Sequence, residues 1–80
     1  MSITAFVTFI PVESSYIHSL RGTYATLERY FADNGAMPTT KQLAALVNLS
    51  ELVTFRRLVD MHRRGWIERE AGVMVLRGIR

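Results

Sequence analysis

The sequence contains no cysteine. This absence excludes a disulfide scaffold, a thiol nucleophile and a zinc site with thiolate ligands. A chain without cysteine is compatible with a reducing compartment, and we expect a cytoplasmic protein.

The sequence also lacks a long hydrophobic run. The apolar start, residues 3–10, has no basic lead-in and is far shorter than the roughly 20 residues that span a bilayer. It predicts neither a signal peptide nor a membrane anchor, so no membrane partner is expected.

The same N-terminal residues have the composition of a strand. They are rich in β-branched and aromatic side chains, and Pro11 removes a backbone donor and disfavours helix before it. We predict an N-terminal β-strand extension over residues 1–12. Its partner would be the edge of another small sheet, in the same chain or in a second subunit.

Residue types that commonly carry catalysis are scattered. His18 and His62 have no second ligand near them in sequence, and the carboxylates show no pair that would form a cleft. Ser14 and Ser15 fit the N-cap of a helix better than the role of nucleophile. We therefore expect no enzymatic activity, no metal site and no cofactor.

The charge balance is mildly basic. Ten Lys and Arg residues stand against seven Asp and Glu residues, which gives a formal net charge of +3. Nine of the ten are arginine, whose planar fork grips phosphate oxygens or a guanine edge with two donors. This excess suits an anionic partner, although a basic surface can also serve solubility alone.

The remaining residues, 13–80, form one predicted domain that is mainly helical. Apolar residues from Ile17 to Phe31 recur at steps of three and four, which predicts a first helix that ends at residues 33–35. Gly22 lies inside this pattern, so either one long helix tolerates it or two helices meet there. Eighty residues can build only one compact core.

Two further helices and a hairpin follow. Thr39 and Gln42 have the spacing of a capping box, so a second helix begins at Thr40 and ends at Asn48. Ser50 caps a third helix, which stops at Gly65. Residues 66–69 and 73–77 flank a short turn, which predicts a small antiparallel β-hairpin with Trp66 in the core beneath it.

The second half of the sequence contains three groups of residues at a characteristic spacing: Leu43 and Ala44, then Asn48, Leu49 and Ser50, then the stretch 64–69. This spacing resembles that of the winged helix-turn-helix family. The pattern is similar to that of MarR-type and GntR-type regulators, and residues 35–39 resemble the DNA-binding domain of LexA-type repressors. The resemblance covers about two-thirds of the chain. It implies a transcriptional regulator that binds double-stranded DNA, with its third helix in the major groove and its hairpin, the wing, on the phosphate backbone. We also expect a homodimer, because one winged domain buries too little DNA surface for high specificity and a second copy doubles the contacts.

The resemblance also implies which residues would contact DNA. The residues expected close to the bases lie on the third helix, whereas cationic residues and residues at helix N-termini are expected to contact the phosphates. The predicted DNA-binding residues are Thr40, Lys41, Ser50, Glu51, Leu52, Val53, Phe55, Arg56, Arg57, Arg69 and Arg77. Arg63 and Arg64 add to the basic residues of the third helix.

The third helix departs from the family pattern because its predicted outer face is apolar. Leu52, Val53 and Phe55 offer no hydrogen bond to a base edge, and Thr54 takes a core position where an aliphatic residue is usual. A rotated helix or contact with thymine methyl groups would explain this. The alternative function is a protein-binding module, an inhibitor or adaptor of possible mobile-element origin, that uses Leu52, Phe55 and Val59 as an apolar stripe.

Overall fold

The computed structural model describes the backbone of residues 2–80 and the side chains of residues 15–80. It contains three helices, α1 (Ser2–Asn34), α2 (Thr40–Val47) and α3 (Glu51–Arg63), followed by the strands β1 (Ile67–Glu70) and β2 (Val73–Leu76). The two strands pair antiparallel, with Ile67 opposite Leu76 and Glu70 opposite Val73. A mainly helical chain with a small antiparallel sheet was predicted, and this is confirmed.

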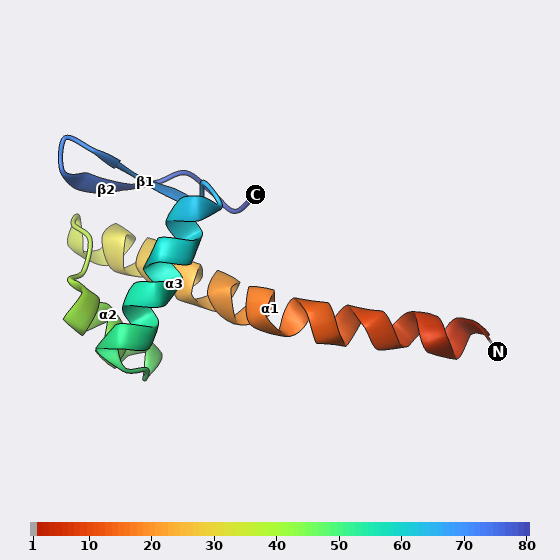
Figure 1. The fold of residues 1–80 in the computed structure, drawn as a ribbon. Helices are drawn as coiled ribbons and strands as arrows, with labels where there is room; N and C mark the ends of the chain where they lie inside the picture. The colour runs from red at the N-terminus through yellow and green to blue at the C-terminus, as the bar shows by residue number, and fades with distance from the viewer. Residues whose placement is uncertain (1) are drawn as a thin grey trace.

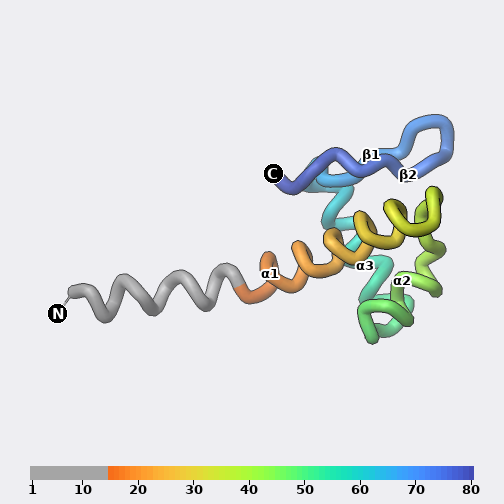
Figure 2. The backbone as a smooth tube through the Cα atoms, turned by 180° about the vertical axis from the view of Figure 1, so that it is seen from behind, coloured from red at the N-terminus to blue at the C-terminus, as the bar shows by residue number. Residues whose placement is uncertain are grey.

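The elements are arranged around α3. It crosses the described part of α1, and α2 and the β-hairpin lie at its opposite ends (Figure 1). The view from behind shows the same order, with α1 now on the near side (Figure 2). The outer side of α3 is therefore left uncovered by the other described elements.

The predicted N-terminal strand is wrong, because residues 3–10 belong to α1 and the sheet found within residues 2–80 consists of β1 and β2. A lone strand would leave its amide and carbonyl groups without a ladder partner, whereas a helix pairs these groups within itself. The predicted caps Ser14 and Ser15 also lie inside α1. The side chains of residues 1–14, including the predicted extension, lie outside the described residues.

The ends of α2 and α3 follow from local chemistry. The hydroxyl of Thr39 accepts from the amide of Gln42 at 3.0 Å, and the Gln42 side chain accepts from the Thr39 amide at 2.8 Å, so the capping box is complete. Asn48 ends α2 with a φ of 58°, and Ser50 caps α3 through a 3.1 Å bond from the Val53 amide. Gly65, with a φ of 79°, ends α3 as predicted.

The turn of the hairpin consists of Ala71 and Gly72. Their φ angles of 53° and 79° are both positive, which is the pattern of a type I′ turn. This turn has a twist that matches the right-handed twist of paired strands, so it fixes the register of β1 and β2.

The core lies where α1, α2, α3 and β1 meet. Leu20 and Leu27 of α1 are buried with Leu43, Met61 and Trp66. The Trp66 ring meets the ring of Tyr24 edge-on, with centroids 6.0 Å apart. Trp66 therefore joins the first helix to the base of the hairpin, the core position predicted for it.

The C-terminal residues are also fixed to this core. The Trp66 indole donates to the carbonyl oxygen of Arg80 at 3.2 Å, and the Gly78 amide donates to the hydroxyl of Tyr24 at 2.7 Å. These bonds satisfy the polar ends of two buried aromatic side chains.

Candidate nucleic-acid interface

The outer surface of α3 is apolar at its centre. Leu52 is 58% exposed, Phe55 55% and Val59 39%. The inner side of the same helix carries Thr54 and Met61, both fully buried. The rotated helix considered above is thus excluded, and the apolar stripe faces outward.

Thr54 occupies its core position without an unpaired hydroxyl. Its Oγ1 donates to the carbonyl oxygen of Ser50 at 2.8 Å, one turn earlier in α3. Because the hydroxyl is satisfied within the helix, the side chain presents its methyl group to the core at little cost.

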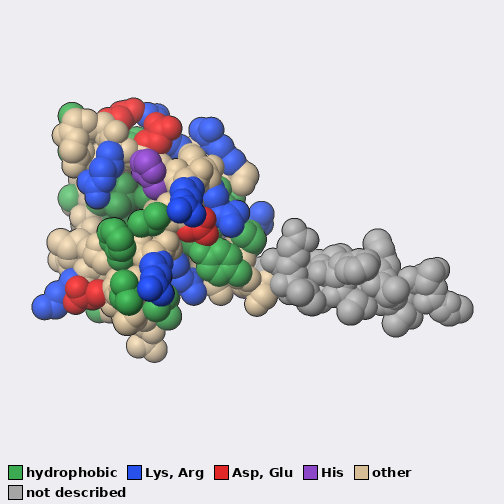
Figure 3. Space-filling model, viewed as in Figure 1, with side chains coloured by type: hydrophobic (Ala, Val, Ile, Leu, Met, Phe, Trp, Pro, Cys, Tyr) green, Lys and Arg blue, Asp and Glu red, His purple; other side chains and the backbone are tan. Residues whose placement is uncertain are grey.

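Cationic side chains surround the apolar centre. Lys41 in the first turn of α2, Arg56 and Arg63 on α3 and Arg69 on β1 are exposed, and within residues 15–80 none of them forms a salt bridge. Figure 3 shows this face with α3 in front, where blue cationic groups lie on several sides of a green patch. Red carboxylates are also visible there, near the hairpin, at the lower left and beside the cationic groups near the centre.

A groove of about 680 Å³ runs between α3, the hairpin and the residues before α2. Phe55, Val59, His62 and Arg63 line it from α3, and Arg69 lines it from β1. Thr40, predicted as a phosphate contact, lies at its edge. Of these groove residues, His62 was not predicted to contact DNA, although it continues the helical spacing that starts at Phe55, and Arg63 was predicted only as one of the basic residues of the third helix.

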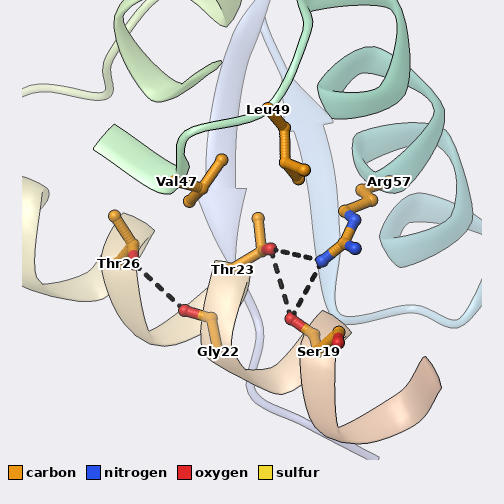
Figure 4. A pocket seen from close by; sticks show the side chains of 7 residues that line it. All are labelled: Ser19, Gly22, Thr23, Thr26, Val47, Leu49 and Arg57. Carbon is orange, nitrogen blue, oxygen red and sulfur yellow. Dashed lines mark hydrogen bonds between the residues drawn. The ribbon is translucent and has the colours of Figure 1, made fainter. Parts of the chain in front are cut away.

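Arg57, predicted as a DNA contact, is directed toward α1 rather than toward this face. Its Nη1 donates to the carbonyl oxygen of Ser19 at 3.2 Å and to the hydroxyl of Thr23 at 3.1 Å, both on α1. Figure 4 shows the side chain directed toward these two residues across an open hollow of about 400 Å³. Arg57 therefore joins α3 to α1 rather than facing a ligand of the outer surface.

Arg77 is also engaged, by carboxylates of its own hairpin. Its Nε lies 3.0 Å from Glu68, and its Nη2 pairs with Glu70. These pairs are exposed and screened by water, so each adds little stability. They do neutralise the two acidic residues of β1, which leaves Arg69 as the hairpin cation without an ion pair in the described residues.

Asp60 is held on the side of α3 that faces α1. The Tyr16 hydroxyl donates to its Oδ2 at 2.6 Å, and Arg64 lies 3.2 Å from its Oδ1. The hydrogen bond from Tyr16 and the charge of Arg64 hold the pKa of Asp60 below its ordinary value. Desolvation, together with the hydrogen bond to Asp60, raises the pKa of Tyr16.

The remaining predicted residues are placed at the N-terminal end of α3. Ser50 uses its hydroxyl as the helix cap, and Glu51 and Val53 are exposed in the first turn. Glu51 puts a negative charge near the positive end of the helix dipole, where it stabilises the helix but also opposes an incoming anion. The interface thus combines an apolar centre and four cations with exposed carboxylates, among them Glu51 on α3 and Glu68, which lines the groove from β1.

A cluster of metal ligands and a helix able to span a membrane are both absent from residues 15–80. No group of three or more His, Cys, Asp or Glu side chains gathers there in a way that would hold a metal ion. No helix in the described part of the chain is long and apolar enough to cross a membrane.

A scan against protein-family models, a search of curated proteins and a search of solved structures each found no match to the chain.

Proposed function

We propose that the chain is a winged helix-turn-helix regulator that binds double-stranded DNA without catalytic activity. In this proposal α3 lies in the major groove and the β-hairpin acts as the wing on the phosphate backbone. One observation carries it: Lys41, Arg56, Arg63 and Arg69 are exposed around α3 and form no salt bridge within residues 15–80. Cations that are not neutralised within the protein are available to replace the counterions of DNA.

The dimensions of α3 support the same proposal. Its 13 residues give a length of roughly 20 Å, and a major groove roughly 12 Å wide admits a helix. Lys41 lies in the first turn of α2, where the helix dipole adds to its attraction for phosphate. A homodimer, which we also propose, would double the contacts that one small domain can make.

Fluorescence anisotropy of a labelled random duplex, measured over a series of salt concentrations, tests the proposal. Each of Arg56→Gln and Arg69→Gln should reduce the slope of log K against log salt by about one unit, because each removes one phosphate contact. Arg29→Gln is a charge-matched control, since Arg29 is exposed on α1. No binding at low salt, or an equal effect of all three variants, would overturn the proposal.

A second candidate function rests on the exposure of Leu52 and Phe55, each more than half exposed on α3. Soluble monomers rarely leave a contiguous apolar stripe of this kind uncovered, so a protein partner would also account for it. The chain would then be an inhibitor or adaptor. Phe55→Ser would abolish binding of the partner while the protein stays folded, and the wild-type protein would not bind duplex DNA at low salt.

A further inference from the structure

The centre of the proposed DNA interface is chemically unusual. Leu52, Phe55 and Val59 lie on one side of α3 at positions i, i+3 and i+7, and all three are exposed. None of them can donate or accept a hydrogen bond. If α3 enters the major groove, these side chains must meet a surface that gains from contact with hydrocarbon.

The edges of the bases differ in how they tolerate such contact. Most groups in the major groove are hydrogen-bond donors or acceptors, which lose water without replacement when an apolar side chain covers them. The C5-methyl group of thymine is the apolar exception among the four bases. A face built from leucine, phenylalanine and valine therefore discriminates between sequences by the methyl groups that they present.

We infer that α3 selects duplex DNA in which thymine methyl groups face Leu52, Phe55 and Val59. This inference rests on the proposed function and names the sequence class that the same face reads. Arg56 lies beside Phe55, and Arg63 lies one turn beyond Val59. Both are exposed, so the apolar centre is flanked by cations that fit the phosphates or guanines on either side.

The length of the stripe sets the size of the preferred sequence. Val59 lies seven positions after Leu52, which corresponds to roughly 10 Å along a helix axis. Successive base pairs are about 3.4 Å apart, so the stripe spans roughly three base pairs. We expect the protein to have a higher affinity for a duplex with a run of about three thymines on one strand than for a duplex with a run of the same length without methyl groups.

Replacement of thymine by deoxyuridine tests the inference, because it removes the methyl group and leaves the hydrogen-bonding edges in place. In a duplex with such a run, each replacement should weaken binding about fourfold, the effect of leaving one methyl group unburied. Conversion of cytosine to 5-methylcytosine in a matched cytosine run places a methyl group at the same edge. It should strengthen binding by a similar factor.

Two exposed leucines provide a test variant, Leu52→Ser, and a matched control, Leu46→Ser. Leu52 is 58% exposed on α3 and Leu46 is 54% exposed on α2, so serine at either position has a similar effect on the free protein. Leu52→Ser should reduce the ratio of affinities for the thymine and deoxyuridine duplexes, and Leu46→Ser should leave it unchanged. Thermal unfolding of both variants verifies that they remain folded.

The outcomes separate this inference from the proposed function. Equal affinity for the thymine and deoxyuridine duplexes, with a steep salt dependence, overturns the thymine preference and leaves DNA binding in place. Discrimination that persists in Leu52→Ser also overturns it, because α3 would not be its source. Absence of binding to any duplex at low salt overturns both proposals.

Discussion

Arg57 offers a sharp test of the fold, because the sequence predicts a DNA contact and the structure shows a bond between helices. Its Nη1 bridges the Ser19 carbonyl oxygen and the Thr23 hydroxyl, at 3.2 and 3.1 Å. Arg57→Met removes both bonds and keeps most of the aliphatic stem. The Thr23 hydroxyl still donates to the Ser19 carbonyl oxygen at 3.3 Å, so no buried polar group loses all its partners.

The expected loss of stability follows from these contacts. A hydrogen bond from a charged donor contributes about 1.5–3 kcal/mol when it is buried, and Arg57 is only half-buried. Solvent screening reduces the sum of the two bonds to roughly 1–2 kcal/mol. In a domain of this size, that loss lowers Tm by about 5–10 °C.

Thermal and urea unfolding, followed by the fluorescence of the buried Trp66, measures this effect. Arg56→Met is the matched control, since Arg56 is exposed on the other side of α3 and should change Tm little. DNA binding should show the reverse order: Arg56→Met should reduce the salt dependence, and Arg57→Met should not. An unchanged Tm for Arg57→Met, together with a reduced salt dependence, would refute this placement of Arg57.

Three further predictions concern stability. Gly22→Ala should raise the free energy of unfolding, measured by urea titration, by about 1 kcal/mol. Gly22 lies inside α1, and an added Cβ meets no atom within 4 Å. A loss of stability would contradict a continuous helix at this position. Thr39→Ala should lower the free energy of unfolding by about 1 kcal/mol by removing the cap of α2, and no change would argue against the capping box. The lowered pKa of Asp60 stabilises the folded protein above the ordinary pKa of an aspartate, and this stability is lost as pH falls through the folded pKa. The raised pKa of Tyr16 stabilises the folded protein below the ordinary pKa of a tyrosine, 10.0, and this stability is lost as pH rises through the folded pKa. The urea midpoint of the Tyr16→Phe variant should therefore depend less on pH than that of the wild type, at both low and high pH. Identical pH dependences of the two midpoints would refute the hydrogen bond between Tyr16 and Asp60.

The ends of α2 and α3 could be predicted from the sequence because they depend on residues close together in the chain. Thr39 with Gln42, Asn48 and Ser50 each act within one turn of a helix, and a single sequence contains all the partners. The hairpin turn could be predicted for the same reason, because its residues are neighbours in the chain. The inward position of Thr54 also followed from the helical spacing.

The errors have a different physical origin. Residues 3–10 have the composition of a strand, but a strand requires a partner edge, and composition does not show whether one exists. Two of the predicted DNA-binding cations have partners in other elements that periodicity does not reveal: Arg57 bonds to α1, and Arg77 pairs with Glu68 and Glu70 on the facing strand. Periodicity places a side chain on a helix face, but it does not show which groups of another element that face meets.

In the proposed function, the outer face of α3 and the hairpin bind double-stranded DNA. Titration of the isotopically labelled protein with a short duplex at low salt, followed through its backbone amide signals, tests it most directly. We expect the signals of residues 51–56, Arg63 and Arg69 to shift together and to return toward their starting positions as salt is added. Shifts confined to α1 around Ser19 and Thr23, or no shifts at all, would contradict it.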